Sequence, residues 1–291
     1  MGQALIAPEY DDSFIAVDDA RLRVRVAGSG PVLALLHGWA LDLDMWTPQF
    51  EALTDAYRLV AFDRRGFGLS TGAASIERDV EDLRLLLDRL QVERAAVLGM
   101  SQGARVALRF ALESPQRTAC VILDGAPALA STQSADVPLE HFRDLVSRAG
   151  VDAFRDAWRR HPLTHIRSTD ARAHALIGRM IVRYRGEDLQ RAAVAGSTFA
   201  LPDLSRLQAP VLLLNGACDS AERLAAAAEL AQRLPHAARV HIRGAAHLAN
   251  LDQAHLYNEA LRGFLQRCAF GETTWSERCP RTSARTTSPR T

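Results

Sequence analysis

The sequence predicts an α/β fold in which helices cover both faces of a mostly parallel β-sheet. From Phe14 to Gly99, short apolar runs alternate with longer amphipathic ones, which is the pattern of strands that alternate with helices. The short runs are continuously apolar, as expected of strands that are covered on both sides. We place such strands at residues 32–36, 59–62, 95–98, 121–123 and 211–214, with a last strand at residues 239–242.

Two further local patterns complete the predicted sheet and its helices. Residues 21–27 alternate leucine and valine with arginine, which indicates a half-exposed strand, and Gly28-Ser29-Gly30-Pro31 indicates a turn into the strand at residues 32–36. We therefore expect an edge hairpin there. Apolar residues at helical spacing predict amphipathic helices at residues 75–90, 102–113, 221–234 and 255–267.

Composition divides the chain into a core, an insertion and a tail. Residues 127–203 have helical periodicity throughout and no convincing strand, so we expect a helical lid between two core segments, residues 1–126 and 204–270. Residues 271–291 are rich in Gly, Thr, Ser, Pro and Arg and hold almost no apolar mass. Such a segment cannot bury enough surface to offset its ordering entropy, so we expect a disordered C-terminal tail.

The chain contains no lysine, so all 35 residues of the combined lysine and arginine count are arginine. Schiff-base, pyridoxal-phosphate and P-loop sites need an amine, whereas arginine keeps its proton in almost any protein environment. Lysine-dependent chemistry is therefore excluded. The arginines are interleaved with 34 acidic residues and the formal net charge is +1, so we expect no nucleic-acid partner.

Cysteine spacing and hydropathy predict the compartment. Cys120, Cys218, Cys268 and Cys279 form no C-x-x-C pair and show no zinc-finger spacing with histidine, which favours free thiols and argues against a metal site. Apolar runs such as Val32–Leu36 are far too short to cross a bilayer. We expect a protein of the reducing cytoplasm without a membrane partner.

The predicted strand at residues 95–98 runs directly into Gly99-Met100-Ser101-Gln102-Gly103 and then into a predicted helix. A strand, a tight turn and a helix are the context in which a G-x-S-x-G sequence marks a nucleophilic serine. The serine of such a turn is strained, and larger residues beside it would clash with neighbouring backbone. Ser101 is therefore the candidate nucleophile.

A serine nucleophile needs a histidine as base and a carboxylate that orients this histidine. His247 lies in the loop after the last predicted strand, at the carboxyl end where an α/β sheet presents functional groups. Asp219 follows the strand at residues 211–214 and gives the chain order Ser, Asp, His that the motif predicts. Asp124 also follows a predicted strand and stays open as the alternative to Asp219.

Negative charge on a tetrahedral intermediate needs backbone N–H donors that are already in place. His37-Gly38-Trp39 follows the strand at residues 32–36 and can supply one donor at Trp39, while Gln102, directly after the candidate nucleophile, supplies the second. This assignment rests on position alone. Asp63, which opens the segment at residues 63–68, is expected to shape that turn.

Together these motifs resemble the α/β-hydrolase fold superfamily, in particular its lidded serine esterases and lactonases, such as 3-oxoadipate enol-lactonases and haloperoxidase-like esterases. The resemblance spans about residues 14–268 and follows the family's order of motifs. Its motifs are His37-Gly38-Trp39, residues 63–70, residues 99–103, Asp219 and residues 244–252. Gln102 departs from the pattern, because many relatives carry methionine or glycine there.

The resemblance implies an eight-stranded, mostly parallel sheet with a helical cap after the sixth strand, and hydrolysis through an acyl-enzyme without a metal or organic cofactor. The predicted activity is that of a carboxylic ester hydrolase acting on an ester or lactone of a small, partly apolar molecule. A cofactor-free perhydrolase or haloperoxidase and a carbon–carbon bond hydrolase would use the same triad, and a catalytically slow binding protein is a further alternative. The sequence predicts no oligomeric state.

Apolar residues of the predicted lid and of the core are candidates for lining a substrate pocket, although ordinary packing is the alternative for each. They are Trp46, Leu129, Trp158, Leu163, Ile166, Met180 and Phe199. The histidine loop resembles that of 3-oxoadipate enol-lactonases, which makes an acidic lactone a candidate substrate. One or two arginines of the lid could then face inward to bind its carboxylate. These are Arg159, Arg160, Arg167, Arg172, Arg179, Arg183 and Arg185.

Overall fold

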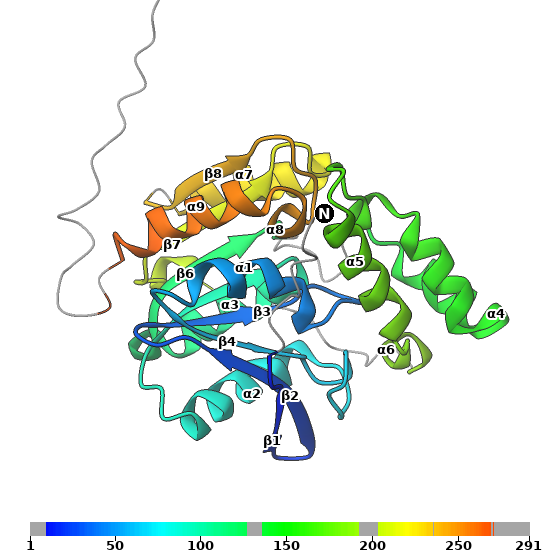
Figure 1. Cartoon of the computed structure of the whole chain (residues 1–291), viewed down its shortest axis with the longest axis horizontal. Helices are drawn as coiled ribbons and strands as arrows, with labels where there is room; N and C mark the ends of the chain where they lie inside the picture. Colours follow the sequence, from blue (N-terminus) through cyan, green and yellow to red (C-terminus); the bar gives the residue numbers. More distant parts are fainter. Residues whose placement is uncertain (1–9, 127–135, 192–202, 235, 269, 271–291) are drawn as a thin grey trace, which may run out of the picture.

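The computed structural model describes residues 10–126, 136–191, 203–234, 236–268 and 270. Within them, eight strands form one sheet in the order β1-β2-β4-β3-β5-β6-β7-β8 (Figure 1). All neighbouring strands from β4 to β8 pair in parallel, so the predicted mostly parallel sheet is confirmed. The strands are β1 (Ser13–Val17), β2 (Ala20–Ala27), β3 (Val32–Leu36), β4 (Arg58–Phe62), β5 (Ala95–Met100), β6 (Thr118–Asp124), β7 (Val211–Gly216) and β8 (Ala238–Ile242).

The sequence predicted an edge hairpin of β2 and β3, and this prediction is wrong because the two strands do not pair with each other. β2 pairs antiparallel with β1 and with β4, and β4 lies between β2 and β3. Both edges of β3 are occupied by parallel partners, β4 and β5, so β2 can join the sheet only outside β4. The hairpin at this edge is formed by β1 and β2, whose turn includes Asp18 at a positive φ of 41°.

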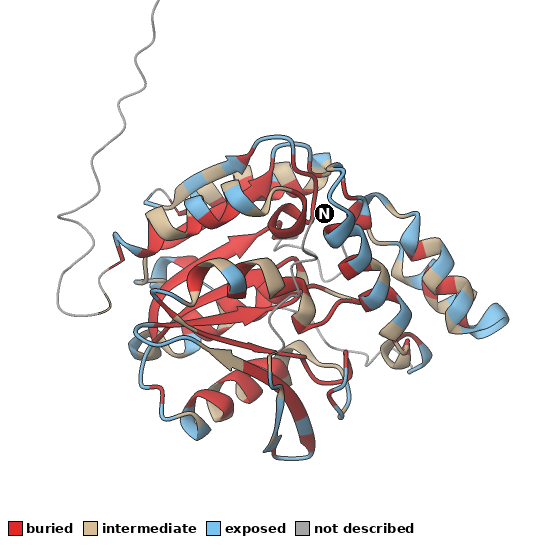
Figure 2. Cartoon of the chain, viewed as in Figure 1, coloured by how far each residue is buried: buried red, intermediate tan, exposed pale blue. Residues whose placement is uncertain are grey.

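Two hydrophobic cores lie on opposite faces of the sheet, because successive side chains of a strand point to opposite sides. One core contains Leu33 and Leu35 of β3, and the other contains Ala34 and Leu36. Figure 2 shows the strands as a buried layer between helices whose outer sides are exposed. The first core is covered by α1 (Thr47–Leu53), α8 (Ala249–Asp252) and α9 (Ala254–Leu265). The second core is covered by α2 (Ile76–Arg89), α3 (Gln102–Glu113) and α7 (Ala221–Arg233).

The sequence predicted four of these core helices, α2, α3, α7 and α9, within two residues of their bounds. It did not predict α1, which packs Phe50 and Leu53 into the first core. Three short 3-10 helices complete the connections of the core. They are η1 (Leu43–Trp46), η2 (Pro115–Arg117) and η4 (Leu204–Arg206).

The segment between β6 and β7, whose described part is residues 136–191 and is called the helical insertion below, contains helices and no strand among those residues. Figure 1 shows these helices gathered at one side of the sheet. They are α4 (Leu139–Arg159), η3 (Pro162–Thr164), α5 (Ala171–Arg183) and α6 (Glu187–Gln190). A positive φ of 80° at Gly150 interrupts α4. The predicted C-terminal tail, residues 271–291, lies outside the described residues.

Polar contacts dock the helical insertion on the core. Arg183 of α5 donates to Asp42 at 2.9 Å and pairs with Asp44 at 2.5 Å, beside η1. On the other side, the Asp252 carboxylate of α8 accepts hydrogen bonds from the backbone N–H groups of Arg167 and Ser168 at 2.9 and 2.7 Å. The insertion is thus tied to the core at η1 and at α8.

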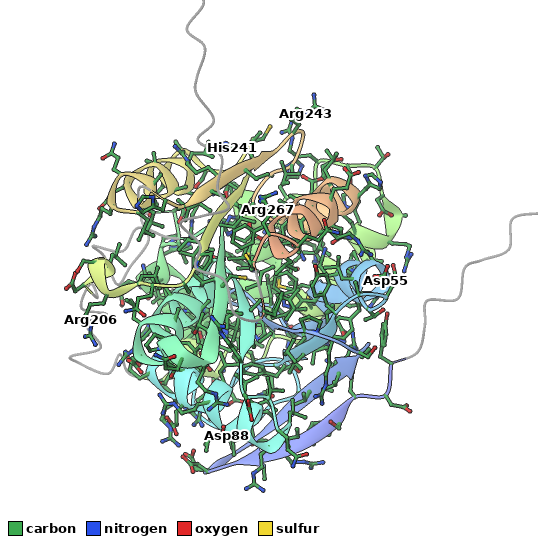
Figure 3. All side chains as sticks on the ribbon, turned by 90° about the vertical axis from the view of Figure 1, so that its left-hand side faces the viewer. Asp55, Asp88, Arg206, His241, Arg243 and Arg267 are labelled. Atoms are coloured by element: carbon green, nitrogen blue, oxygen red, sulfur yellow. The ribbon has the colours of Figure 1, made fainter. Side chains whose placement is uncertain are left out.

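Some of the charged side chains lie on the outside of the molecule. Figure 3 shows the labelled residues Asp55, Asp88, Arg206 and Arg243 toward the periphery of the view. Among the described helices, none combines the length and the apolar character that a membrane span requires.

Candidate active site

Ser101 lies at the turn between β5 and α3, in a backbone conformation that residues with a side chain rarely adopt. Its φ is 53° and its ψ is −116°. Such a conformation costs on the order of 1–3 kcal/mol and persists only where the surrounding structure enforces it. Here the N–H of Ser101 donates to the carbonyl oxygen of Asp124 at 2.7 Å, which fixes the turn against the end of β6. Ser101 therefore stands on the strained elbow that the sequence predicts.

Close backbone packing requires glycine at two positions of the elbow. A Cβ atom on Gly99 would lie 2.1 Å from the carbonyl oxygen of Gly103. A Cβ atom on Gly103 would lie 2.4 Å from the carbonyl oxygen of Leu36 and 2.7 Å from that of His37. All of these are backbone atoms, which cannot move aside as a side-chain end can. The G-x-S-x-G sequence therefore lets α3 pack directly on β5 and on the end of β3.

The structure brings His247 and Asp219 together at the carboxyl ends of β8 and β7. The Nδ1 atom of His247 lies 3.0 Å from Oδ1 and 3.1 Å from Oδ2 of Asp219. Because a carboxylate can only accept, the imidazole donates its Nδ1–H and leaves Nε2 unprotonated in the neutral form. Both side chains are buried, with His247 4% and Asp219 7% exposed.

The Asp219 carboxylate is held in its charged form. Burial alone would raise its pKa. The charge and hydrogen bond of His247, together with hydrogen bonds from the N–H of Ser220 and the side-chain amide of Asn215, lower the pKa by more than burial raises it. The pKa of Asp219 therefore lies below its ordinary value. The Ser220 N–H and the Asn215 amide donate at 2.7 and 3.2 Å, respectively.

Asp124, the alternative to Asp219, has a different partner. Its Oδ2 atom accepts a hydrogen bond from the hydroxyl of Tyr257 at 2.9 Å. Burial raises the pKa of Asp124 well above its ordinary value, and the negative charge of Asp219 raises it further. A group that is driven toward the neutral acid is a poor partner for an imidazolium, so the geometry and the charge both favour Asp219.

Two contacts fix the loop that carries His247. The Oδ2 atom of Asp252 accepts from the backbone N–H of Ala246 at 2.9 Å, one residue before the histidine. Behind the ring, Gly125 lets the imidazole pack directly on the backbone, because a Cβ atom there would lie 2.8 Å from Cε1 of His247. Since Asp252 also binds the helical insertion, the histidine loop and the insertion share one carboxylate.

Ser101 and His247 line a common cavity between the core and the helical insertion. Trp158 and Leu163, two of the predicted substrate-binding residues, lie in its wall. The described residues around it are Gly38, Trp39, Leu41, Met100, Ser101, Val137, Trp158, Leu163, Thr164, His247 and Leu248. None of these described side chains is an acid or an arginine, and the wall is mainly apolar.

The other pocket candidates lie elsewhere. Trp46, Ile166 and Met180 are packed into the hydrophobic core and are not among the described residues that line the cavity. For Trp46 and Met180 the alternative of ordinary packing therefore holds, because their side chains are 0% and 1% exposed. Leu129 and Phe199 lie outside the described residues.

None of the seven candidate arginines of the helical insertion is among the described residues that line the cavity. Arg183 and Arg185 point to the core, where Arg185 donates to the carbonyl oxygens of Gly68 and Ser70. The other five of the seven candidate arginines are exposed. They are Arg159, Arg160, Arg167, Arg172 and Arg179.

The candidate oxyanion donors flank the nucleophile. A Cβ atom on Gly38 would lie 3.4 Å from Cβ of Ser101, so the His37-Gly38-Trp39 segment runs directly beside the serine. Gln102 is the first residue of α3, and the first four N–H groups of a helix have no partner within it. The hydrogen bonds of the described backbone leave the N–H groups of Trp39 and Gln102 available.

Arg223 was missed by the sequence analysis. This arginine of α7 is 2% exposed, and its Nη1 atom donates to Oγ of Ser101 at 3.4 Å and to the carbonyl oxygen of Gly125 at 3.2 Å. Its Nε and Nη2 atoms pair with the Asp136 carboxylate at 2.9 and 3.0 Å. Arg223 lies four residues after Asp219 in an ordinary amphipathic helix, and no local pattern marks it.

Asp63 has the structural role that the sequence predicts for it. Its two carboxylate oxygens accept from the N–H groups of Leu43 and Leu69 at 2.8 and 2.7 Å, and a Cβ on Gly68 would collide with it at 2.1 Å. Burial raises the pKa of Asp63 to about 7, and the nearby Asp42 adds to this shift. Asp63 therefore shapes the turn after β4 and η1 beside it.

The fold agrees with the comparisons with known proteins. Residues 31–254 match the model of the alpha/beta hydrolase fold family, so the chain belongs to this family. It is 30% identical to the pimeloyl-[acyl-carrier protein] methyl ester esterase of Xanthomonas oryzae pv. oryzae, over 84% of this chain and 98% of that protein. It is 26% identical to 3-oxoadipate enol-lactonase 2 of Acinetobacter baylyi, over 81% of this chain and 89% of that protein.

A solved structure extends the likeness to three dimensions. The thermophilic esterase of Thermogutta terrifontis matches with a TM-score of 0.73 and 26% identity, over 89% of this chain and 99% of that chain. The resemblance to lidded esterases and lactonases is therefore confirmed at the level of the family. The relatives act on different substrates by name, so the substrate of this chain has to be argued from its own cavity.

Substitution of Gly103 by alanine tests the packing of the elbow. Gly103→Ala should lower the free energy of unfolding by about 1–3 kcal/mol or more, because its Cβ meets backbone atoms that cannot yield. Gly178→Ala is the matched control, since no atom lies within 4 Å of a Cβ there. In the middle of α5 this control should raise stability by about 0.5–1 kcal/mol. Urea unfolding measures both, and equal effects of the two changes would contradict the packing argument.

Proposed function

We propose that this protein is a serine hydrolase that cleaves an ester or lactone bond of a small, partly apolar substrate through an acyl-enzyme. The observation that carries the proposal is the pairing of His247 with Asp219 at 3.0 Å, with His247 lining the same cavity as the strained Ser101. A nucleophile, a base and a group that orients the base are the minimum set for this chemistry.

In the first half of the reaction, His247 removes the proton of the Ser101 hydroxyl as Oγ attacks the carbonyl carbon of the substrate. Asp219 stabilises the imidazolium that forms, because its lowered pKa keeps it charged. The imidazolium then returns the proton to the departing alkoxide, and the alcohol leaves. In a lactone the same bond breaks, but the alcohol stays attached to the acyl group.

In the second half, a water molecule takes the place of the alcohol. His247 removes one proton of this water while its oxygen attacks the acyl carbon, and the proton then passes to Oγ of Ser101 as the acid is released. In both halves the backbone N–H groups of Trp39 and Gln102 donate hydrogen bonds to the oxyanion of the tetrahedral intermediate and so stabilise its negative charge.

Arg223 supports the nucleophile in this scheme. A guanidinium can only donate, so the contact of 3.4 Å uses a lone pair of Oγ and leaves the hydroxyl hydrogen free for His247. The Asp136 carboxylate balances the charge of Arg223, and although burial raises the pKa of Asp136, Arg223, Ser220 and His247 together lower it below its ordinary value.

The cavity favours a neutral acyl group. Its described wall is formed by Trp39, Leu41, Met100, Val137, Trp158, Leu163 and Leu248, and the polar side chains beside them are Ser101, Thr164 and His247. An anionic group in such a wall would lose its hydration without compensation, because Arg223 beside Ser101 is already paired with Asp136. The cavity therefore argues against an acidic lactone as the substrate and favours an ester or lactone with a neutral acyl group. An ester substrate also agrees with the esterase names among the relatives.

The free cysteines support a place in the cytoplasm. Cys120 and Cys268 are buried free thiols, and Cys218 is an exposed free thiol. Unpaired thiols are typical of a reducing compartment.

Removal of the nucleophile is the first test of this function. Ser101→Ala should lower kcat for short p-nitrophenyl esters by about 10³-fold or more, because the covalent route is lost. The purified wild-type protein measured in the same assay is the reference. Retention of wild-type activity by Ser101→Ala would contradict the proposed mechanism.

A paired substitution tests the choice of carboxylate. Asp219→Asn should lower kcat by about 10³–10⁴-fold, because the amide cannot stabilise the imidazolium. Asp124→Asn keeps an acceptor for the Tyr257 hydroxyl and should leave kcat within about threefold of the wild type. The opposite ranking of the two variants in the ester assay would reassign the acid to Asp124.

Two acyl groups of equal length test the substrate class. The kcat/KM of p-nitrophenyl butyrate should exceed that of mono-p-nitrophenyl succinate by about tenfold or more, because the succinyl carboxylate enters an apolar wall. The rates of both esters without enzyme correct for their intrinsic reactivity. Equal or faster hydrolysis of the succinyl ester would show that a cation reaches the acyl group.

A further inference from the structure

Arg64 is a buried arginine beside the proposed oxyanion hole, and the steps above give it no role. It is 0% exposed. Its Nη2 atom donates to the side-chain oxygen Oε1 of Gln102 at 2.7 Å and to the carbonyl oxygen of Gly38 at 3.4 Å. One guanidinium nitrogen therefore touches both segments that carry the candidate oxyanion donors.

The backbone of Arg64 makes a second connection to the same place. Its N–H donates to Nε2 of His37 at 2.8 Å. The ring must then carry its hydrogen on Nδ1, which donates to the carbonyl oxygen of Gly38 at 2.7 Å. Burial and the charge of Arg64 hold the pKa of His37 well below its ordinary value, so the ring is neutral and this pattern is stable.

The charge of Arg64 is balanced within the core. Its Nη1 atom lies 2.7 Å from Oδ2 of Asp79, whose side chain is 1% exposed. Burial raises the pKa of Asp79 to about 6, and Arg64 opposes that rise. Asp79 is thus ionised at pH 7 and holds the guanidinium in place. The guanidinium carbon also lies 4.8 Å from the ring centroid of Phe67, which restricts it further.

From these contacts we propose that Arg64 is a positioning residue that sets the spacing between the two backbone N–H donors, at Trp39 and at Gln102. It binds Gln102 through the side chain and holds Gly38, the neighbour of Trp39, directly and through His37. The inference rests on the proposed function, because it concerns the oxyanion hole of that reaction.

The physical reason is that an oxyanion hole works by preorganisation. Its donors must lie about 2.7–3.1 Å from the position that the oxyanion takes, and they gain most when they need not move during the reaction. The two donors here come from different segments, the end of β3 and the start of α3, so their spacing needs a fixed link. The Gln102 side chain, which departs from the methionine or glycine of many relatives, provides the acceptor for that link.

Gln102→Met tests the link with little risk to the fold. Methionine has a similar length, keeps the backbone N–H and leaves the pair of Arg64 and Asp79 intact. We expect kcat for p-nitrophenyl butyrate to fall about tenfold with KM nearly unchanged, because the loss concerns the transition state. The inhibition constant of a trifluoromethyl ketone, which forms a tetrahedral adduct with serine hydrolases, should rise by a similar factor.

Gln49→Met is the matched control for a purely structural effect. Gln49 is a buried glutamine whose amide donates to the carbonyl oxygen of Asn250 at 3.2 Å and to the side chain of Asn258 at 3.0 Å, which joins α1 to α8 and α9. This variant should lose stability and keep the wild-type kcat. A tenfold loss of kcat in both variants would mean that general loosening, and not the spacing of the donors, is responsible.

Arg64→Lys provides an independent variant. Lysine keeps a charge for Asp79, but a single ammonium cannot reproduce the planar fork of contacts. The double variant Arg64→Lys, Gln102→Met should lose no more than the stronger single variant, since both remove the same link. Additive losses, or an unchanged kcat in Gln102→Met, would overturn the proposal. If the wild-type protein hydrolyses no ester, the proposed function itself fails, and that result is separate from these.

Discussion

The backbone of Ser101 is held at a φ of 53° by a hydrogen bond to the end of β6 and by close backbone packing at Gly99 and Gly103, and the placement of the site depends on that turn. The N–H bond to Asp124 fixes the turn to β6, and the absence of side chains at Gly99 and Gly103 lets α3 approach the ends of β5 and β3. This close approach places Gln102 beside the segment after β3. A looser turn would separate the nucleophile from the base, and it would also separate the two candidate oxyanion donors from each other.

Buried arginines connect the segments around the site to neighbouring parts of the core. Arg64 reaches the candidate oxyanion hole, Arg65 forms a double hydrogen bond with Asp82 after β4, and Arg223 lies behind Ser101. Each makes several directed contacts at once, which the planar guanidinium allows and an ammonium does not. The complete use of arginine in place of lysine therefore has a structural consequence in this chain. The buried cations act as rigid connectors, and each of these three is paired with a nearby carboxylate.

The sequence predicted those features that local patterns determine. The continuous apolar runs located β3 to β7, and the elbow located Ser101, because both signals lie within a few residues. The partner of β2 was predicted wrongly, since pairing depends on which strand fills the neighbouring position in space. The sequence favoured Asp219 over Asp124 by chain order alone, whereas the structure separates them by their partners, His247 for Asp219 and Tyr257 for Asp124, and by the opposite shifts of their pKa values. Similarly, Trp158 and Trp46 are both apolar aromatic residues, and only the packing shows that one lines the cavity and the other fills the core.

The central claim is that Ser101 is a nucleophile activated by His247 and Asp219. Intact-mass spectrometry after treatment with a fluorophosphonate tests it most directly, because this reagent reacts with activated serines and needs no knowledge of the substrate. The account predicts one adduct per chain, located in the peptide that contains Ser101. An unlabelled wild-type protein, or an adduct at another residue, would contradict it.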